Sequence, residues 1–379
     1  MSSCQTHVQK FGPSAPFWGN FRSAVSLHSH TMYSREYLKR LPGYIRRIPI
    51  AHLMIEWEVG RLLLYKNHCI DFRRVYWTPP LSAREALDLE KGQIAKQLGL
   101  RPLVSLTDHD SIEAGLHLRL LDTGCDAPVS VEWSVPYADT VFHLGVHNLS
   151  AAHAAEWMSR FANFTACPSE SSLRELLNDL HQHSSILVVL NHPLWDAESA
   201  GSDAHRRSLG QFVARFGALL HAVELNGMRS RRENREILKL GEEINQPVIS
   251  GGDRHGCEPN AVLNLTAAET FEQFVQEIRV ERRSEVLLMP QFFEPLQARL
   301  LESAWHALSD APGEFGRRHW MTRVFYEDEN RVPQPVSGFM GTRFHMKVDR
   351  FRWIMALLAS PQVRPALRVA FLGNEDGGL

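Results

Sequence analysis

Short apolar runs alternate along the chain with longer stretches in which apolar residues recur every three or four positions. The runs are rich in β-branched residues, which favours strands, and the longer stretches have the period of amphipathic helices. Alternation of this kind is typical of βα units around a parallel sheet. We predict strands at 24–27, 103–106, 129–131, 141–144, 186–190, 222–225 and 248–249, and helices at 82–98, 112–121, 151–164, 171–183, 207–220 and 231–244.

Two segments fall outside this alternation. Residues 36–80 are rich in Arg, Tyr and Trp, and we interpret them as an insertion after the first strand that could cover a site. From about residue 290 onward the pattern predicts mainly helix, at 295–308 and 348–358, with a loop-like stretch at 311–341. We therefore expect one α/β domain over residues 1–290 and a helical C-terminal extension over residues 291–379.

Composition excludes several classes of protein. The 41 basic and 43 acidic side chains leave a net charge of −2, so no overall field draws the chain to nucleic acid or to an anionic membrane. The apolar runs are too short to span a bilayer and the first residues lack an apolar signal segment, which predicts a cytoplasmic protein with no membrane partner. The five cysteines form no CxxC pair, so neither a disulfide framework nor a thiolate zinc site is expected.

Histidine is the unusual residue, because many of the 19 histidines stand where predicted strands end. In parallel barrels the carboxyl ends of the strands converge on one face, where active sites are built. Residues far apart in sequence are therefore expected to meet there. The segments concerned read SLHSH, SLTDHD, SVEWS, VFHLGVH, VVLNHP and VISGGDRHG.

The first three clusters supply both imidazoles and carboxylates. His28 and His30 lie two residues apart at a strand end and point to the same side, where they can bind one cation. His109 follows the second strand, and Asp108 beside it could orient an imidazole or handle a proton. Glu132 lies within a strand, where a buried carboxylate must be paired or bound to metal.

The remaining clusters complete the set. His143 lies in a predicted strand, with His147 as a competing candidate, and His192 is held by the proline that follows it. Asp253 and His255 project together from a glycine-rich turn. Any one of these histidines alone is more commonly a structural residue, but clusters at six strand ends together indicate a metal site.

Nitrogen and oxygen ligands without thiolates suit Zn, Mn or Fe, and their number indicates two or three divalent ions. Such centres activate water to hydroxide near neutral pH and hold the attacking and leaving oxygens of a displacement. This chemistry favours hydrolysis of a phosphate ester by a metal-bound hydroxide.

The order of the motifs HxH, TDHDS, VEWS, FHLG, NHP and GGDRH resembles the PHP family, named for polymerase and histidinol phosphatase domains, over roughly residues 20–290. The resemblance implies a distorted (β/α)7 barrel, two or three metal ions and phosphoesterase activity. TDHDS and the ExS pattern at Glu132 are more similar to the nucleotide and oligonucleotide phosphoesterases of the family. Matched motif by motif, the implied metal ligands are His28, His30, His109, Glu132, His143, His192, Asp253 and His255.

One position departs from the family pattern. Many members carry an Asp or His ligand five or six residues after the first pair, and here Arg35 and Glu36 stand in these places. Glu36 can bind a metal and Arg35 cannot, so a third ion depends on Glu36. Arg254, between two predicted ligands, and Arg229 are candidate substrate-binding residues for a phosphate, although an ion pair would account for either equally well.

The prediction is therefore a metal-dependent phosphoesterase acting on a small phosphorylated metabolite, a nucleotide or an oligonucleotide, with nucleic acid only as a substrate. Asp108, His109 and Arg254 are its candidate catalytic residues. One alternative is an amidohydrolase-like enzyme acting on a non-phosphate substrate, although the strand-end lysine usual in that class is not found. Another is a PHP-like module that binds metal or a partner without catalysis. The sequence does not predict an oligomeric state.

Overall fold

The computed structural model describes residues 4–12, 18–39, 71–121, 126–310 and 319–335, with the single positions 337, 353, 356 and 363. The fold is mixed α/β, as the pattern predicted, and its strands form two five-stranded sheets. One sheet has the order β1-β12-β11-β2-β5, with β1 Gln5–Lys10, β2 Ser23–Leu27, β5 Arg101–Ser105, β11 Val262–Thr266 and β12 Arg283–Leu288. The other has the order β10-β9-β8-β7-β6, with β6 Val129–Tyr137, β7 Thr140–Leu149, β8 Leu187–Asn191, β9 Ala222–Asn226 and β10 Val248–Gly251.

The sheets are not purely parallel, which corrects the prediction. Strands β2 and β5 are parallel, as are β8, β9 and β10, but β6, β7 and β8 run antiparallel to one another. β6 and β7 form a hairpin, because the two residues between them are too few for a crossover connection. Ala138 in this turn has a φ of 49°, as tight hairpin turns require.

The two sheets approach each other where the predicted ligands lie. Backbone N–H groups of Gly252 and His30 donate to the carbonyls of Leu27 and Arg254, at 2.9 and 2.8 Å, so the chain after β10 runs beside the chain after β2. On the other side, the N–H of Glu132 donates to the carbonyl of Asp108 at 3.1 Å. In the described residues the sheets remain two units, and closure into a (β/α)7 barrel stays a prediction.

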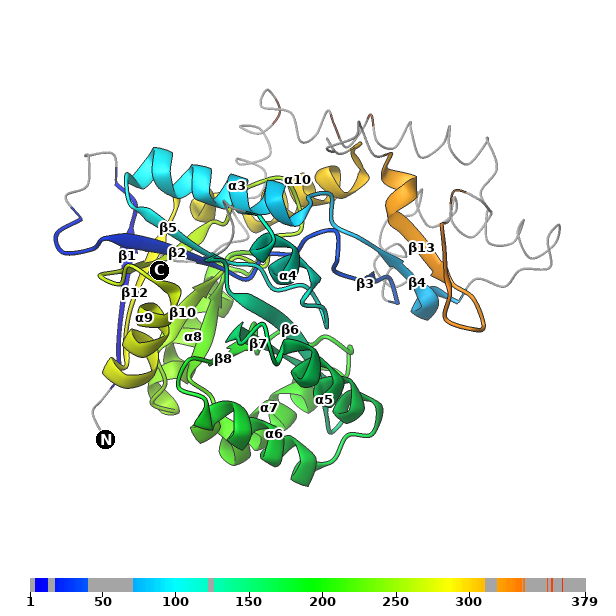
Figure 1. Cartoon of the computed structure of the whole chain (residues 1–379), viewed down its shortest axis with the longest axis horizontal. Helices are drawn as coiled ribbons and strands as arrows, with labels where there is room; N and C mark the ends of the chain where they lie inside the picture. The colour runs from blue at the N-terminus through cyan, green and yellow to red at the C-terminus, as the bar shows by residue number, and fades with distance from the viewer. Residues whose placement is uncertain are drawn as a thin grey trace.

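The six predicted helices are confirmed to within a few residues, and their apolar faces explain their positions. α3 begins at a capping box, in which Ser82 and Glu85 cap each other's backbone N–H groups. α6 buries four leucines at helical spacing, each worth about 1.5–3 kcal/mol of transfer free energy. In Figure 1 the helices α5, α6 and α7 lie on the opposite side of the sheets from α3. The helices are α3 Ala83–Gln93, α4 Glu113–Arg119, α5 Ala154–Ala166, α6 Glu170–Gln182, α7 Ser202–Phe216, α8 Arg231–Glu243, α9 Phe271–Gln276 and α10 Leu296–Leu308.

None of the helices in the described part of the chain is both long and apolar enough to cross a bilayer.

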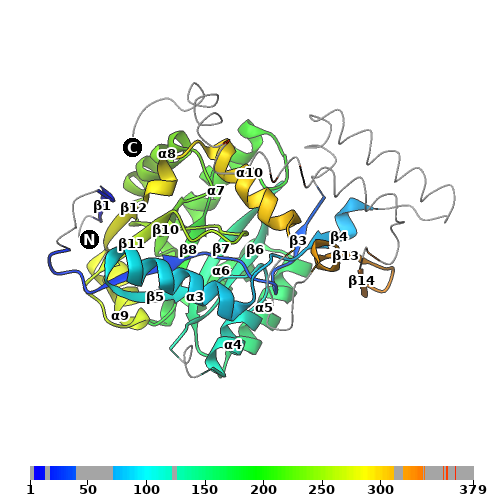
Figure 2. The same ribbon diagram turned by 90° about the horizontal axis from the view of Figure 1, so that it is seen from above.

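A third, small sheet joins the insertion to the C-terminal extension. Its order is β14-β13-β4-β3, with β3 Glu36–Tyr37, β4 Val75–Trp77, β13 Val324–Glu327 and β14 Pro333–Pro335. Figures 1 and 2 both place it at the end of the molecule away from β1, β12 and α9. The loop expected at 311–341 therefore contains two strands, and the extension is not simply helical, since β13 pairs with β4 of the insertion. Helix α10 confirms the prediction at 295–308, whereas the helix expected at 348–358 and most of 36–80 lie outside the described residues.

Candidate metal centre

Glu132 on β6 lies at the centre of the predicted ligands, and both of its carboxylate oxygens face imidazoles. Oε2 lies 3.1 Å from Nε2 of His28 and 3.3 Å from Nε2 of His30. The same oxygen lies 3.3 Å from Nδ1 of His109. Oε1 lies 3.0 Å from Nε2 of His192 and 3.5 Å from Nδ1 of His143. One buried carboxylate thus links five histidines that come from four segments of the chain.

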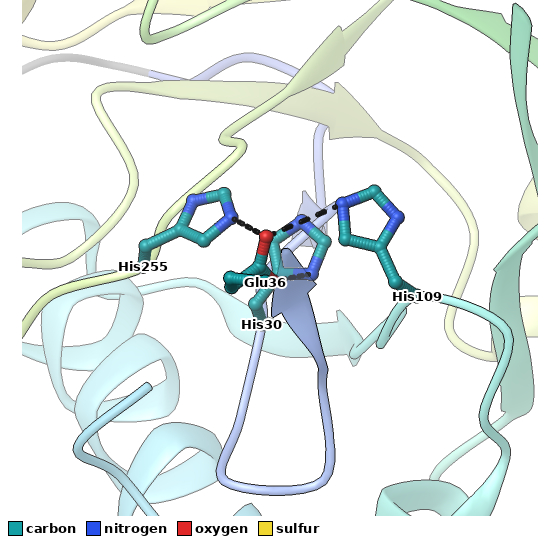
Figure 3. Close-up of side chains that lie close together, drawn as sticks. All are labelled: His30, Glu36, His109 and His255. Atoms are coloured by element: carbon teal, nitrogen blue, oxygen red, sulfur yellow. Dashed lines mark ion pairs between the residues drawn. The ribbon is translucent and has the colours of Figure 1, made fainter. Parts of the chain in front are cut away.

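Two further carboxylates complete the cluster. Oδ1 of Asp253 lies 3.7 Å from Nε2 of His28 and 3.6 Å from both Nε2 of His30 and Nδ1 of His255. Oε2 of Glu36 lies 3.3 Å from Nε2 of His255 and 3.5 Å from Nε2 of His109 (Figure 3). His109 contacts Glu132 through its other ring nitrogen, Nδ1. Glu36 therefore occupies the position on which a third ion was expected to depend.

The donor set fits divalent cations. The nine residues fall into four overlapping groups whose ligand atoms lie within 4.8 Å of one another. Several inward-facing atoms are buried without a hydrogen-bond partner, namely Nε2 of His28, Nε2 of His30, Nδ1 of His143 and Oε2 of Glu132. Unpartnered buried polar atoms are costly, and cations bound among them would satisfy all four. The groups are His30, Glu36, His109 and His255; His28, His30 and Glu132; His28, His192 and Asp253; and His109, Glu132 and His143.

Three of these residues have strained backbones. His28, His192 and Asp253 have φ angles of 59°, 27° and 53°, in the region that non-glycine residues rarely adopt. Each such residue costs on the order of 1–3 kcal/mol unless its surroundings hold it, and such strain concentrates at functional sites. Here the N–H of Asp253 donates to the carbonyl of His28, which fixes both turns together.

Charged neighbours in the cluster oppose the effect of burial on the pKa values of Glu132 and His28. Burial favours the neutral form of Glu132, but His28, His109 and His143 hold the pKa of its carboxyl well below the usual value. Burial likewise lowers the pKa of His28, yet Glu132 and Glu224 raise it well above the ordinary value. Burial and the neighbouring His255 lower the pKa of His30 to about 3. Ionised carboxylates and a neutral His30 are the protonation states in which these groups bind metals.

A layer of residues around the ligands was missed from the sequence. Glu224 on β9 contacts Nδ1 of His28 and accepts a hydrogen bond of 2.8 Å from the N–H of His192. Asn191 donates to Oε1 of Glu132 at 3.0 Å. The signal for Glu224 was present, since an acid within the apolar run 222–225 has the same unusual position as Glu132. Carboxylates of this kind fix the tautomer and orientation of ligand imidazoles.

Glycine at position 251 is required by this layer. A Cβ atom there would lie 1.5 Å from Oε1 of Glu224, so no larger residue fits beside that carboxylate. Glycine allows close approach to the backbone, and Glu224 is the group that approaches the backbone here.

Arg254 was predicted to bind phosphate and to take part in catalysis. The structure instead buries its side chain away from the candidate ligands. Its side chain is 1% exposed and points away from the ligands on either side of it. Nε lies 2.9 Å from Oε1 of Glu90 on α3, and Nη1 donates to the carbonyl of Gly256 at 2.8 Å. Alternation along the strand-like turn explains this, because successive side chains point to opposite sides.

Asp108 and His147 also differ from expectation. Both carboxylate oxygens of Asp108 accept hydrogen bonds from Thr31, through its N–H and its hydroxyl, so the carboxylate holds the turn after His30 and does not orient an imidazole. His147 lies with Nδ1 2.8 Å from the hydroxyl of Ser105, outside the four groups. Of these two histidines, only His143 belongs to a group of possible metal ligands among the described residues.

Arg229 remains beside the cluster. One of its Nη atoms lies 3.4 Å from Oδ2 of Asp253, and its guanidinium lies over the ring of Trp195 at 4.6 Å. The side chain is 17% exposed, so it lies at the border between the buried ligands and solvent. Of the two candidate arginines, only Arg229 is placed to meet a substrate.

Comparisons with known proteins identify no family. No protein-family model matches the chain and no curated protein matches its sequence. PsfC from Pseudomonas syringae has a similar structure with a TM-score of 0.37 and 15% identity, over 56% of this chain and 84% of that one. A protein assigned as a metal-dependent phosphoesterase from Bifidobacterium adolescentis has a TM-score of 0.32 and 16% identity, over 54% of this chain and 92% of that chain.

An amidohydrolase from Chromobacterium violaceum, with bound sulfate and no metal, gives a TM-score of 0.31 at 15% identity, over 47% of this chain and 83% of that chain. All three scores lie below 0.5, so these likenesses establish neither a shared fold nor a shared activity. Function is therefore inferred from the site alone.

Proposed function

We propose that the protein is a metal-dependent hydrolase that cleaves phosphate esters. The observation that carries the proposal is the position of Glu132, whose two oxygens face five imidazole nitrogens at 3.0–3.5 Å in a buried site. A carboxylate with both oxygens facing histidines is suited to bridge two cations. When bound, such ions lower the pKa of water and neutralise charge on a phosphoryl group.

Three cations are the number that the ligands support best. A neutral imidazole offers one lone pair, so His30 and His109, which face both Glu132 and Glu36, can each serve one ion only. With His30 on the Glu132 side, Glu36, His109 and His255 remain for a third ion. Zn, Mn and Fe suit this set of nitrogen and oxygen ligands. The hydrogen bonds that join the ends of β2, β5, β6 and β10 support the proposed barrel around the site.

The chain's own residues account for binding and orientation. Glu224 holds the ring of His28, and Asp108 holds the turn after His30. Arg229, at the border of the cluster, is a donor for a phosphoryl oxygen, and its cation favours a phosphate over a neutral amide.

The test is hydrolysis of 4-nitrophenyl phosphate by protein loaded with Mn, Zn or Fe. We expect turnover that chelation or His109→Ala abolishes. Full activity in metal-free protein would contradict the proposal. If the metal-loaded protein hydrolyses lactones or amides instead of phosphate esters, the proposed substrate class is wrong but the proposed metal dependence stands.

A further inference from the structure

The candidate ligands differ in their exposure to solvent. The side chains of His255, His109 and Glu36 are 22%, 16% and 14% exposed, whereas those of His28, His30 and Glu132 are at most 1% exposed. A substrate must therefore approach over the three exposed ligands, which Figure 3 shows together with His30. A side chain beside these three residues is therefore placed to contact the leaving group of the substrate.

Trp77 lies at this open side. Its ring centroid is 6.2 Å from that of His255, and the indole is partly exposed. Trp77 is also the direct partner of Glu36 in the antiparallel pairing of β3 with β4. Directly paired residues place their side chains on the same face of a sheet, so the face that supplies Glu36 to the cluster also supplies Trp77.

Other aromatic rings, Trp195 beside the cluster and two tyrosines on the small sheet, already have partners on their faces. The guanidinium of Arg229 lies over Trp195, that of Arg35 over Tyr76 and that of Arg74 over Tyr326, at 4.6, 5.4 and 5.1 Å. None of the cation–ring contacts found within the described ranges involves Trp77. Trp77 is therefore the indole best placed to stack on a ligand.

We propose that Trp77 selects esters whose leaving group carries a planar aromatic ring, an aryl group or a nucleobase, by stacking on that ring beside the metal centre. The inference rests on the proposed function, and it gives the small sheet a role. β4 from the insertion and β13 from the extension hold Trp77 between Glu36 and Val324, so two remote segments build one recognition element. Stacking of a planar ring on an aromatic side chain contributes enough for about a tenfold effect.

The experiment compares phenyl phosphate with cyclohexyl phosphate, which carry rings of similar size but only one of which is planar and aromatic. Trp77→Leu is expected to lower kcat/KM for phenyl phosphate about tenfold, mainly through KM, and to change cyclohexyl phosphate less than twofold. Trp77→Phe keeps a planar ring and is expected to retain most of the preference. Equal losses with both esters, or no loss with either, would overturn the inference.

Two controls distinguish a failure of this inference from a failure of the proposed function. Tyr37→Leu removes an aromatic residue next to Glu36 on β3, and it should leave the ratio between the two esters unchanged. If the wild-type protein hydrolyses neither ester, the proposed function fails, and calorimetry with phenylphosphonate and cyclohexylphosphonate still tests Trp77. A preference for phenylphosphonate that Trp77→Leu removes would support the stacking role, and equal affinities in the wild type would end it.

Discussion

Glu224 contacts the Nδ1 atom of His28, and its second oxygen accepts the backbone N–H of His192, so one carboxylate on β9 orients two ligand segments. His28 then presents Nε2 to Glu132 and Asp253. This contact fixes the tautomer of His28, because Nδ1 must carry the proton that faces Glu224. Both residues are fully buried, so water cannot take over the role of either.

Replacing this carboxylate should weaken metal binding without removing a ligand. We expect Glu224→Gln to lower metal affinity about 10- to 100-fold, measured by competition with a chelating dye. Glu277→Gln is the matched control, since Glu277 is also a buried glutamate but bonds Thr266 in another part of the fold. Equal effects of the two substitutions would show that loss of any buried carboxylate is sufficient and would contradict the specific role of Glu224.

The third ion should depend on Glu36 alone among the carboxylates. Glu36→Gln is expected to lower the metal content by one ion per chain, because only His109 and His255 would remain on that side. Elemental analysis after gel filtration measures the number of ions. Glu285→Gln, in a strand pair remote from the cluster, should leave the content unchanged. Unchanged content in Glu36→Gln would mean that the outer group holds no ion.

Arg229 should act on substrate binding more than on metal binding. We expect Arg229→Ala to raise KM for 4-nitrophenyl phosphate about tenfold, since a charge-assisted hydrogen bond to phosphate is worth roughly 1.5–3 kcal/mol. Metal content should be unchanged, as Arg229 is not a ligand. Arg232→Ala, which removes an exposed arginine from the same helix region, is the control. Loss of metal in Arg229→Ala would instead assign Arg229 to the support of Asp253.

The grouping of these side chains was predictable from the sequence because strand ends carry them in a fixed order, and the position of Glu132 within an apolar strand already required a compensating charge. Glu36 was predicted only as the residue on which a third ion depends, and the structure brings it to the cluster through β3. The directions of β6 and β7 were not predictable from apolar runs alone, because periodicity does not distinguish a hairpin strand from a crossover strand.

Arg254 illustrates a second limit. Its position between two ligands suggested a place at the site mouth, but alternation turns its side chain towards α3, where Glu90 meets it. Glu90 and Arg254 are 164 residues apart in the chain, and no local sequence pattern links them. The small sheet was missed for the same reason, since β4 and β13 pair across most of the chain.

The Arg254–Glu90 pair should be costly to break one residue at a time. Arg254→Met leaves the carboxylate of Glu90 buried, with Ser26, Ser29 and Asn260 as its remaining donors among the described residues. We expect this substitution to lower the free energy of unfolding by about 3–5 kcal/mol. Glu90→Gln should also destabilise, and the double variant should lose less than the sum of the two. Urea unfolding in a chelator measures all three without a contribution from metal. Additive losses would contradict direct coupling.

Acid sensitivity should arise in part from His221, which is remote from the metal centre. Its Nδ1 accepts the backbone N–H of Val188 at 2.9 Å, and burial, Arg279 and His181 lower its pKa to about 2. The unfolded chain binds a proton near pH 6.5, so between pH 6.5 and about 2 the unfolded state holds more protons than the folded state. The stability contributed by His221 is therefore complete above pH 6.5 and is lost as the pH falls, at up to about 1.4 kcal/mol per pH unit.

We expect His221→Gln to flatten this loss, because a glutamine does not titrate. Chemical unfolding of chelated protein between pH 7 and 4 gives the slope of stability against pH for wild type and variant. His153→Gln, which replaces an exposed histidine, should keep the wild-type slope. The histidines and acids of the metal centre titrate in all three proteins, so their contribution to the slope of stability against pH cancels in the comparison. A His221→Gln slope equal to that of wild type would show that the folded protein admits a proton at His221 near pH 6.5 and would refute its burial as a neutral group.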